Sequence, residues 1–74
     1  MKLTGSQLET AGRLMFGDKW ISQMSEFLNV DYRRVKQWRR GDIEIPQGVI
    51  SEIVDYLKKN AEKELQFAEK IENS

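Results

Sequence analysis

The residues best suited to chemistry lie in the middle of the chain, where cationic and hydrogen-bonding side chains are crowded together. Among residues 31–41, five are basic and only Asp31 is acidic. The five basic residues are Arg33, Arg34, Lys36, Arg39 and Arg40. Guanidinium and ammonium groups bind phosphate oxygens, and Arg and Gln side chains can form paired hydrogen bonds to the edges of bases. With Tyr32 and Gln37 among these cations, the segment predicts contact with a polyanion.

The formal net charge of zero hides this basic segment. Residues 1–30 hold three basic and three acidic groups, whereas residues 42–74 hold eight carboxylates and four lysines, a net charge of −4. The segment 31–41, at +4, is therefore cancelled by an acidic C-terminal part. A local field of one sign steers a polyanion whatever the total charge, so the neutral total does not argue against nucleic acid.

Other kinds of chemistry lack their usual groups. The chain has neither Cys nor His, which removes thiolate ligands, disulfides and the commonest base near neutral pH. Glu62 with Glu64, and Asp42 with Glu44, are close in sequence, but each pair falls where a solvated face is expected. We therefore expect no enzyme: no catalytic residue, no metal site, no cofactor and no small-molecule ligand.

The lack of cysteine fits a reducing compartment. Residues 1–6 lack the apolar core of a signal peptide, and no apolar run approaches the roughly 20 residues that cross a bilayer. These features predict a soluble protein of the cytoplasm that has no membrane partner.

Helical periodicity predicts an all-α fold of four to five helices that would position the central side chains. Thr4 and Gln7 have the spacing of a capping box, which marks the start of a first helix that should run to about Phe16. The predicted buried face of this helix contains Leu8, Ala11, Leu14 and Met15. Gly17 is placed to end the helix in the left-handed conformation.

A second and a third short helix should follow with almost no loop between them. Asp18 is placed to cap the second helix. The apolar residues of that helix are Trp20, Ile21, Met24, Phe27 and Leu28. Asn29 tolerates the left-handed conformation, and Asp31 can cap a third helix over residues 32–40. The predicted buried stripe of the third helix consists of Val35 and Trp38. So tight a connection makes two helices cross at a large angle, as in a helix-turn-helix unit.

A long fourth helix is predicted to begin at Pro46, which suits a first helical position because it lacks an N–H. Its docking residues should be Val49, Ile50, Ile53, Val54 and Leu57. Gly48 near its start is explained either by close packing or by a tolerant first turn. Because no Gly or Pro interrupts residues 49–74, we expect a helix of about 25 residues.

The apolar stripe of this helix continues among Glu and Lys residues beyond residue 60. We therefore expect residues 1–60 to form the domain, and residues 61–74 to extend the last helix as a dimerisation element. The expected interface of the homodimer consists of Val54, Leu57, Ala61, Leu65, Ala68 and Ile71.

Residues 24–41, Met-Ser-Glu-Phe-Leu-Asn-Val-Asp-Tyr-Arg-Arg-Val-Lys-Gln-Trp-Arg-Arg-Gly, resemble the helix-turn-helix signature of lambda-repressor-like regulators of the XRE and Cro type. The matching positions are Leu28, Val30, Val35, Trp38 and Gly41. Asn29 stands at a turn where the family has Gly, and Arg34 replaces the usual Thr. Ile21 stands where a polar residue, often Gln, is common. The segments on either side are similar to small phage and mobile-element regulators, including anti-CRISPR-associated repressors.

The resemblance implies a lambda-repressor-like domain that binds double-stranded DNA with its third helix in the major groove. Base contacts are expected from Tyr32, Arg33, Lys36 and Gln37. Phosphate contacts are expected from Lys19, Ser22, Gln23, Arg34, Arg39 and Arg40. Together with the apolar stripe, this predicts a dimeric transcriptional repressor that occupies an inverted repeat in a promoter of a phage or mobile element, including its own promoter. For such a regulator the resemblance implies a place in the bacterial cytoplasm or nucleoid.

A protein-interaction module is the alternative function. The acidic last helix with its apolar stripe could bind a partner protein, as an antitoxin binds its toxin, while the helix-turn-helix fold is retained. The +4 segment 31–41 has no purpose in a pure adaptor, which favours DNA. The two functions are compatible in one chain.

Overall fold

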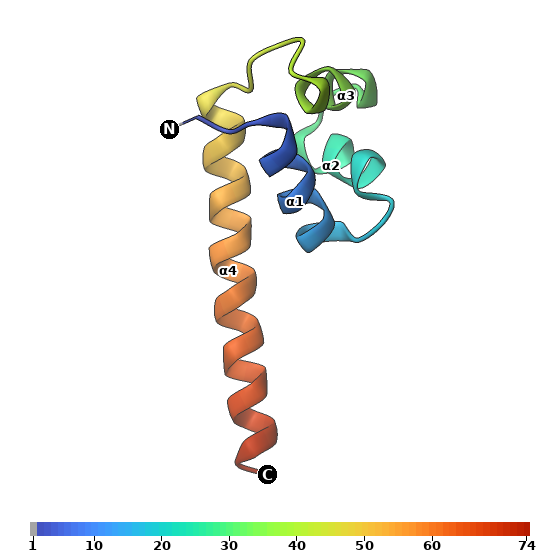
Figure 1. Cartoon of the computed structure of the whole chain (residues 1–74). Coiled ribbons are helices and arrows are strands. Elements are labelled where there is room, and N and C mark those ends of the chain that lie inside the picture. The colour runs from blue at the N-terminus through green and yellow to red at the C-terminus, as the bar shows by residue number, and fades with distance from the viewer. Residues whose placement is uncertain (1) are drawn as a thin grey trace.

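Four helices make up the protein in a computed structural model that describes residues 2–74 (Figure 1). They are α1 (Gly5–Phe16), α2 (Trp20–Leu28), α3 (Tyr32–Arg40) and α4 (Gln47–Glu72). No strand occurs among the described residues. The predicted all-α class with an extended last helix is therefore confirmed.

The helices α1, α2 and α3 pack against one another, and the first half of α4 lies against α1 (Figure 1). Its predicted docking residues are in place: Ile50 and Ile53 are buried, and Val49, Val54 and Leu57 pack against the core. The second half of α4 runs on past the bundle and stretches the molecule to 49 × 25 × 20 Å. The predicted division at residue 60 thus falls inside one unbroken helix of 26 residues.

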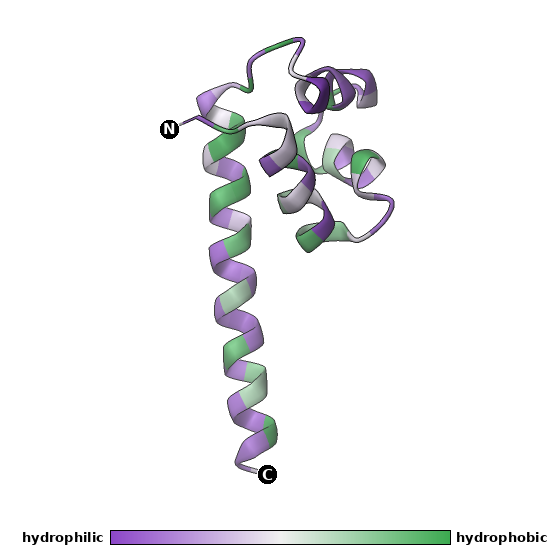
Figure 2. Ribbon diagram, in the orientation of Figure 1, coloured by the Kyte–Doolittle hydropathy of each residue, from purple (hydrophilic) through white to green (hydrophobic). Residues whose placement is uncertain are grey.

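The exposed second half of α4 is largely hydrophilic with apolar residues spaced along it, as Figure 2 shows. Every residue from 61 to 74 is exposed. Within residues 2–74 we find no helix that combines the length and the apolar character needed to cross a membrane.

Local hydrogen bonds begin and end most helices as the sequence predicts. The Thr4 hydroxyl accepts from the Gln7 N–H at 3.1 Å, and the Gln7 side-chain oxygen accepts from the Thr4 N–H at 2.9 Å. The Asp31 carboxylate caps α3 by accepting from the backbone N–H two residues on, at 2.9 Å. Asn29 and Gly41 end α2 and α3 in the left-handed conformation, with φ of 57° and 84°. These confirmed caps fix the short connections between the helices.

Three predicted helix ends are wrong in detail. Asp18 does not cap α2: Lys19 is the N-cap residue, and the Asp18 carboxylate accepts from the Arg13 guanidinium at 3.3 Å because this cation stands beside it at the end of α1. Gly17 has φ 82° and ψ −152°, a region open to glycine that is not left-handed helical. Pro46 is the N-cap of α4 rather than its first helical residue.

Among residues 2–74, ten buried apolar side chains form one core between the short helices and α4. They are Leu8, Ala11, Met15, Trp20, Met24, Val35, Trp38, Ile45, Ile50 and Ile53. The prediction for Leu14 is wrong, since its side chain is 72% exposed. Leu14 follows Leu8 by six residues and so lies about 120° away around the helix. Gly12 is buried instead, with the Trp20 indole directly against it.

Gly12→Ala should therefore lower the free energy of unfolding, because its Cβ would collide with the Trp20 ring. Alanine normally stabilises a helix interior relative to glycine by about 1 kcal/mol, but overpacking here should give a net loss of about 1–3 kcal/mol. Gly48→Ala is the matched control in α4. No atom lies within 4 Å of a Cβ at Gly48, which rules out close packing and predicts a small gain. Urea unfolding of both variants measures the difference, and equal effects would contradict the packing.

Candidate nucleic-acid interface

A tight turn presents α3 on the surface next to α2. Asn29 in its left-handed conformation reverses the chain, and the Val30 N–H donates to the Ser25 carbonyl at 3.0 Å to close the turn. α3 then packs through Val35 and Trp38, which are buried at 0% and 3% exposure. The confirmed buried stripe leaves the opposite side of α3 facing solvent.

Four polar side chains share that outward side of α3. Arg33, Lys36, Gln37 and Arg40 are spaced i, i+3, i+4 and i+7, so they form one strip along the helix. Arg33, Lys36 and Arg40 are exposed, and Gln37 is half-buried. Figure 2 shows α3 as an almost wholly hydrophilic helix. Three of the four residues predicted for base contacts are thus brought together here, with Arg40 added to them.

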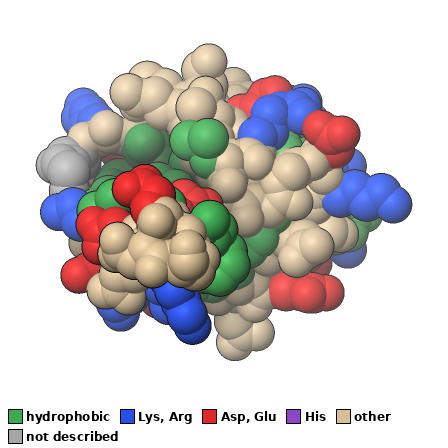
Figure 3. Space-filling model, turned by 90° about the horizontal axis from the view of Figure 1, so that it is seen from below, with side chains coloured by type: hydrophobic (Ala, Val, Ile, Leu, Met, Phe, Trp, Pro, Cys, Tyr) green, Lys and Arg blue, Asp and Glu red, His purple; other side chains and the backbone are tan. Residues whose placement is uncertain are grey.

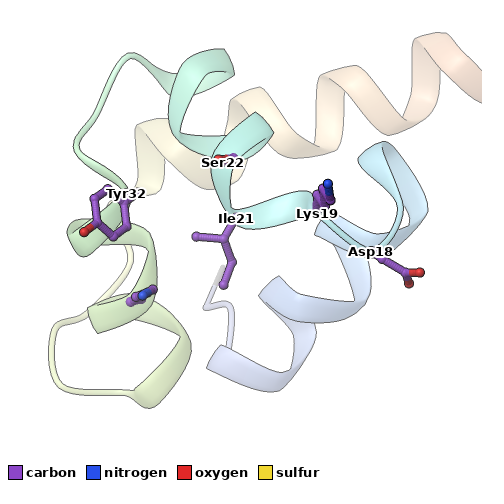
Figure 4. Close-up of a pocket in the computed structure, with 6 residues that line it drawn as sticks. Asp18, Lys19, Ile21, Ser22 and Tyr32 are labelled. Carbon is purple, nitrogen blue, oxygen red and sulfur yellow. The ribbon is translucent and has the colours of Figure 1, made fainter.

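Tyr32, the fourth predicted base contact, lies to one side of this strip, between α3 and the start of α2. The Lys36 ammonium stands 5.0 Å from the centre of the Tyr32 ring, within the range of a cation–π contact. Both residues line an open pocket of about 370 Å³ together with Ile21 and Ser22 of α2 (Figure 4). Tyr32 therefore lies between Lys36, at the edge of the outer strip, and the predicted phosphate-contact region at the start of α2.

The start of α2 has the properties of an anion contact. Its N-cap, Lys19, makes no side-chain capping bond, so the first backbone N–H groups of α2 are not capped by a side chain. Such groups and the helix dipole favour a phosphate. Lys19, Ser22 and Gln23 are all exposed around this end, as the predicted phosphate contacts require. Ile21, where the family favours a polar residue, is half-buried.

The arginines of α3 fall into two groups by their ion pairs. Arg33 Nε lies 3.5 Å from the Asp31 carboxylate, and Arg40 Nε lies 3.1 Å from the Asp42 carboxylate. Arg34 and Arg39 have no ion pair with any described residue. Their charges are therefore not balanced by a carboxylate, whereas Arg33 is held next to the N-terminus of α3.

Sequence reasoning missed this second role of Asp31. It was predicted only as a helix cap, yet the same oxygen that accepts the Arg33 N–H also lies near the Arg33 guanidinium. The signal was present, because an acidic cap two residues before an arginine places both groups on the first turn. The contact between Lys36 and Tyr32 could likewise be predicted from their i, i+4 spacing.

The predicted dimer residues lie on α4 in two environments. Val54 and Leu57 are half-buried against the core, whereas Ala61, Leu65, Ala68 and Ile71 are exposed. Phe67, which the sequence analysis did not select, is 64% exposed on the same half of the helix. Residues 2–74 contain no group of three or more acidic residues placed to hold a metal ion.

No family model, curated protein or solved structure matches this chain.

Proposed function

We propose that this protein is a sequence-specific, double-stranded DNA-binding transcriptional regulator that inserts α3 into a major groove. The observation that carries the proposal is the strip of Arg33, Lys36, Gln37 and Arg40 on the side of α3 opposite the core. A major groove admits one α-helix, and side chains on its outward face reach the base edges.

Each side chain of the strip suits a particular partner. A guanidinium such as that of Arg33 pairs with O6 and N7 of guanine, and an amide such as that of Gln37 pairs with N6 and N7 of adenine. Lys36 adds donors beside them, while Tyr32 packs on a thymine methyl group or bonds a phosphate. Phosphates on either side would be held by Arg34 and Arg39 and by the start of α2. Arg40, at the end of the strip, contacts the backbone as the groove curves away.

The protein acts as a homodimer in this proposal, because two copies related by two-fold symmetry place two recognition helices in successive major grooves of an inverted repeat. Occupation of a promoter, including its own, represses transcription sterically. Control of a phage or mobile-element gene is the setting suggested by the resemblance of residues 24–41 to lambda-repressor-like regulators.

Selection of binding sites from random double-stranded DNA at about 150 mM salt tests the proposal. We expect an enriched inverted repeat whose half-sites are about 34 Å apart, one helical turn. Salt-sensitive binding to all DNA without an enriched motif would overturn sequence-specific regulation.

Arg39→Ala is expected to weaken binding to specific and random DNA alike. A phosphate contact carries no sequence information, so the plot of log affinity against log salt should become shallower by about one unit. Lys59→Ala is the charge-matched control, because Lys59 lies on α4 and pairs with Asp55 at 3.5 Å. A base-specific loss in Arg39→Ala, or an equal change in the control, would contradict the assignment.

A protein-interaction module remains the second candidate, favoured by the exposed apolar residues on the projecting half of α4. In that case a partner protein, such as a toxin neutralised by this chain, covers α4. Two results together would favour the protein-interaction module. No α3 variant would lose DNA binding, and the chain would form a stable complex with a protein encoded next to it.

A further inference from the structure

An apolar groove runs along the surface between α1 and α4. It has a volume of about 290 Å³, and Leu3, Ala11 and Leu14 line one side while Val54 and Leu57 line the other. Leu14 stands at the groove with 72% of its side chain exposed. Figure 3, which looks onto the end of α4, shows apolar side chains on the sides of this helix and in the recess beside it.

The projecting half of α4 carries an apolar stripe that matches this groove. Ala61, Leu65 and Ala68 are exposed and continue the helix face of Val54 and Leu57. Leu65 is flanked by two alanines, so it projects from the stripe between positions where another backbone can approach closely. The projecting residues 61–72 span about 18 Å, close to the length of the docked half.

The spacing of this stripe is symmetrical about Ala61. Leu57 and Leu65 lie four residues before and after it, and Val54 and Ala68 lie seven residues before and after it. Two antiparallel copies of α4 that cross at Ala61 therefore place Leu65 of each opposite Leu57 of the other, and Ala68 opposite Val54. Every stripe position from 54 to 68 then meets an apolar position.

We propose that the groove between α1 and α4 receives the projecting half of α4 from a second copy of this chain, in an antiparallel, two-fold symmetric pair. The inference deepens the homodimer of the proposed function and rests on it. The occupant is a second copy because the groove and the stripe that fills it are both present in one chain and match in length and spacing. A parallel pair would place Leu65 against Leu65 of the second copy, away from Leu57 and the groove.

One charged pair at the edge of the stripe agrees with this register. The crossing brings Lys58 near Glu62 of the second copy, and this pair occurs twice by symmetry. Asp55 falls toward Glu69 of the second copy, but the Asp55 carboxylate is already paired with the Lys59 ammonium at 3.5 Å. Lys59 itself lies on the side of α4 opposite the stripe and does not meet the second copy.

Introduced cysteines distinguish the two orientations cleanly, because the chain has no cysteine of its own. Ala61→Cys should form a disulfide-linked dimer under mild oxidation. Ala68→Cys alone should not, since its two copies would be about 21 Å apart, but it should cross-link to Val54→Cys in a mixture of the two proteins. Cross-linking of Ala68→Cys to itself would overturn the antiparallel pair, and failure of Ala61→Cys to cross-link would overturn the contact altogether.

Leu65→Glu tests the groove in solution. Leu65 is 61% exposed in the single chain, so the fold should be unaffected while the dimer dissociation constant rises by about 100-fold. Gln66→Glu adds the same charge one residue on, about 100° around the helix, and should leave the dimer intact. Sedimentation of both variants gives the constants. An unchanged dimer in Leu65→Glu would overturn the proposal, whereas a cross-linked dimer that binds no DNA would overturn the proposed function alone.

Discussion

Replacing Trp38 with alanine is expected to unfold the domain at ordinary temperature. Its indole is 3% exposed and joins α3 to the core, so its loss should lower the free energy of unfolding by about 3–5 kcal/mol. A chain of 74 residues has a total stability of about 4–11 kcal/mol, which leaves little in reserve. Far-ultraviolet circular dichroism and urea unfolding measure the loss.

Trp38→Phe is the control for this experiment. It keeps an aromatic ring in the core but removes part of the larger indole, including its N–H, which is buried without a hydrogen-bond partner among the described residues. We expect a clearly smaller loss of stability than for alanine. If Trp38→Ala unfolds cooperatively with nearly the original midpoint, α3 does not depend on this side chain for its position.

Replacing Arg33 with alanine is expected to reduce affinity for the selected DNA site by about 1–3 kcal/mol and to relax the preference at one base pair. Arg33 belongs to the outward strip of α3 and is 76% exposed, so its removal should leave the fold intact. Affinity for random DNA should fall much less. Equal losses on selected and random DNA would show that Arg33 contacts phosphate rather than a base.

Asp31→Asn separates the two roles of the α3 cap. Asparagine caps a helix about as well as aspartate, so stability should be nearly unchanged. The variant loses the carboxylate that lies 3.5 Å from Arg33 Nε, so the guanidinium is no longer held near the N-terminus of α3. We expect reduced discrimination at the base pair read by Arg33, with nonspecific affinity equal or higher because a negative charge has been removed. Unchanged discrimination would show that Asp31 acts only as a cap.

The candidate interface depends mostly on local features that the sequence contains. The i, i+3, i+4 and i+7 spacing of the outward strip follows from helix geometry once α3 is bounded by Asp31 and Gly41. Those boundaries depend on a carboxylate near its own backbone and on glycine at a positive φ, which are interactions within a few residues. The exposure of this strip could therefore be predicted from the chain alone.

Two of the errors arose where one helix meets another. Leu14 fits an apolar pattern on α1, but only the approach of Trp20 makes Gly12 the buried position. Asp18 has the residue type and position of a helix cap, but the Arg13 guanidinium at the end of α1 donates a hydrogen bond to its carboxylate instead. In each case a partner outside the predicted helix decided the outcome.

What the sequence by itself determined is the set of helices, most of their ends and the polar face of α3, because these depend on residues within one or two turns. The tertiary structure decided which faces of the helices are covered. Gly5, on α1, lies so close to the carbonyl of Arg39 that a Cβ at this position would collide with it. This contact sets how closely α3 packs on α1. The open groove between α1 and α4 has the same origin. Such features depend on the distance between helices far apart in the chain, which local periodicity does not specify.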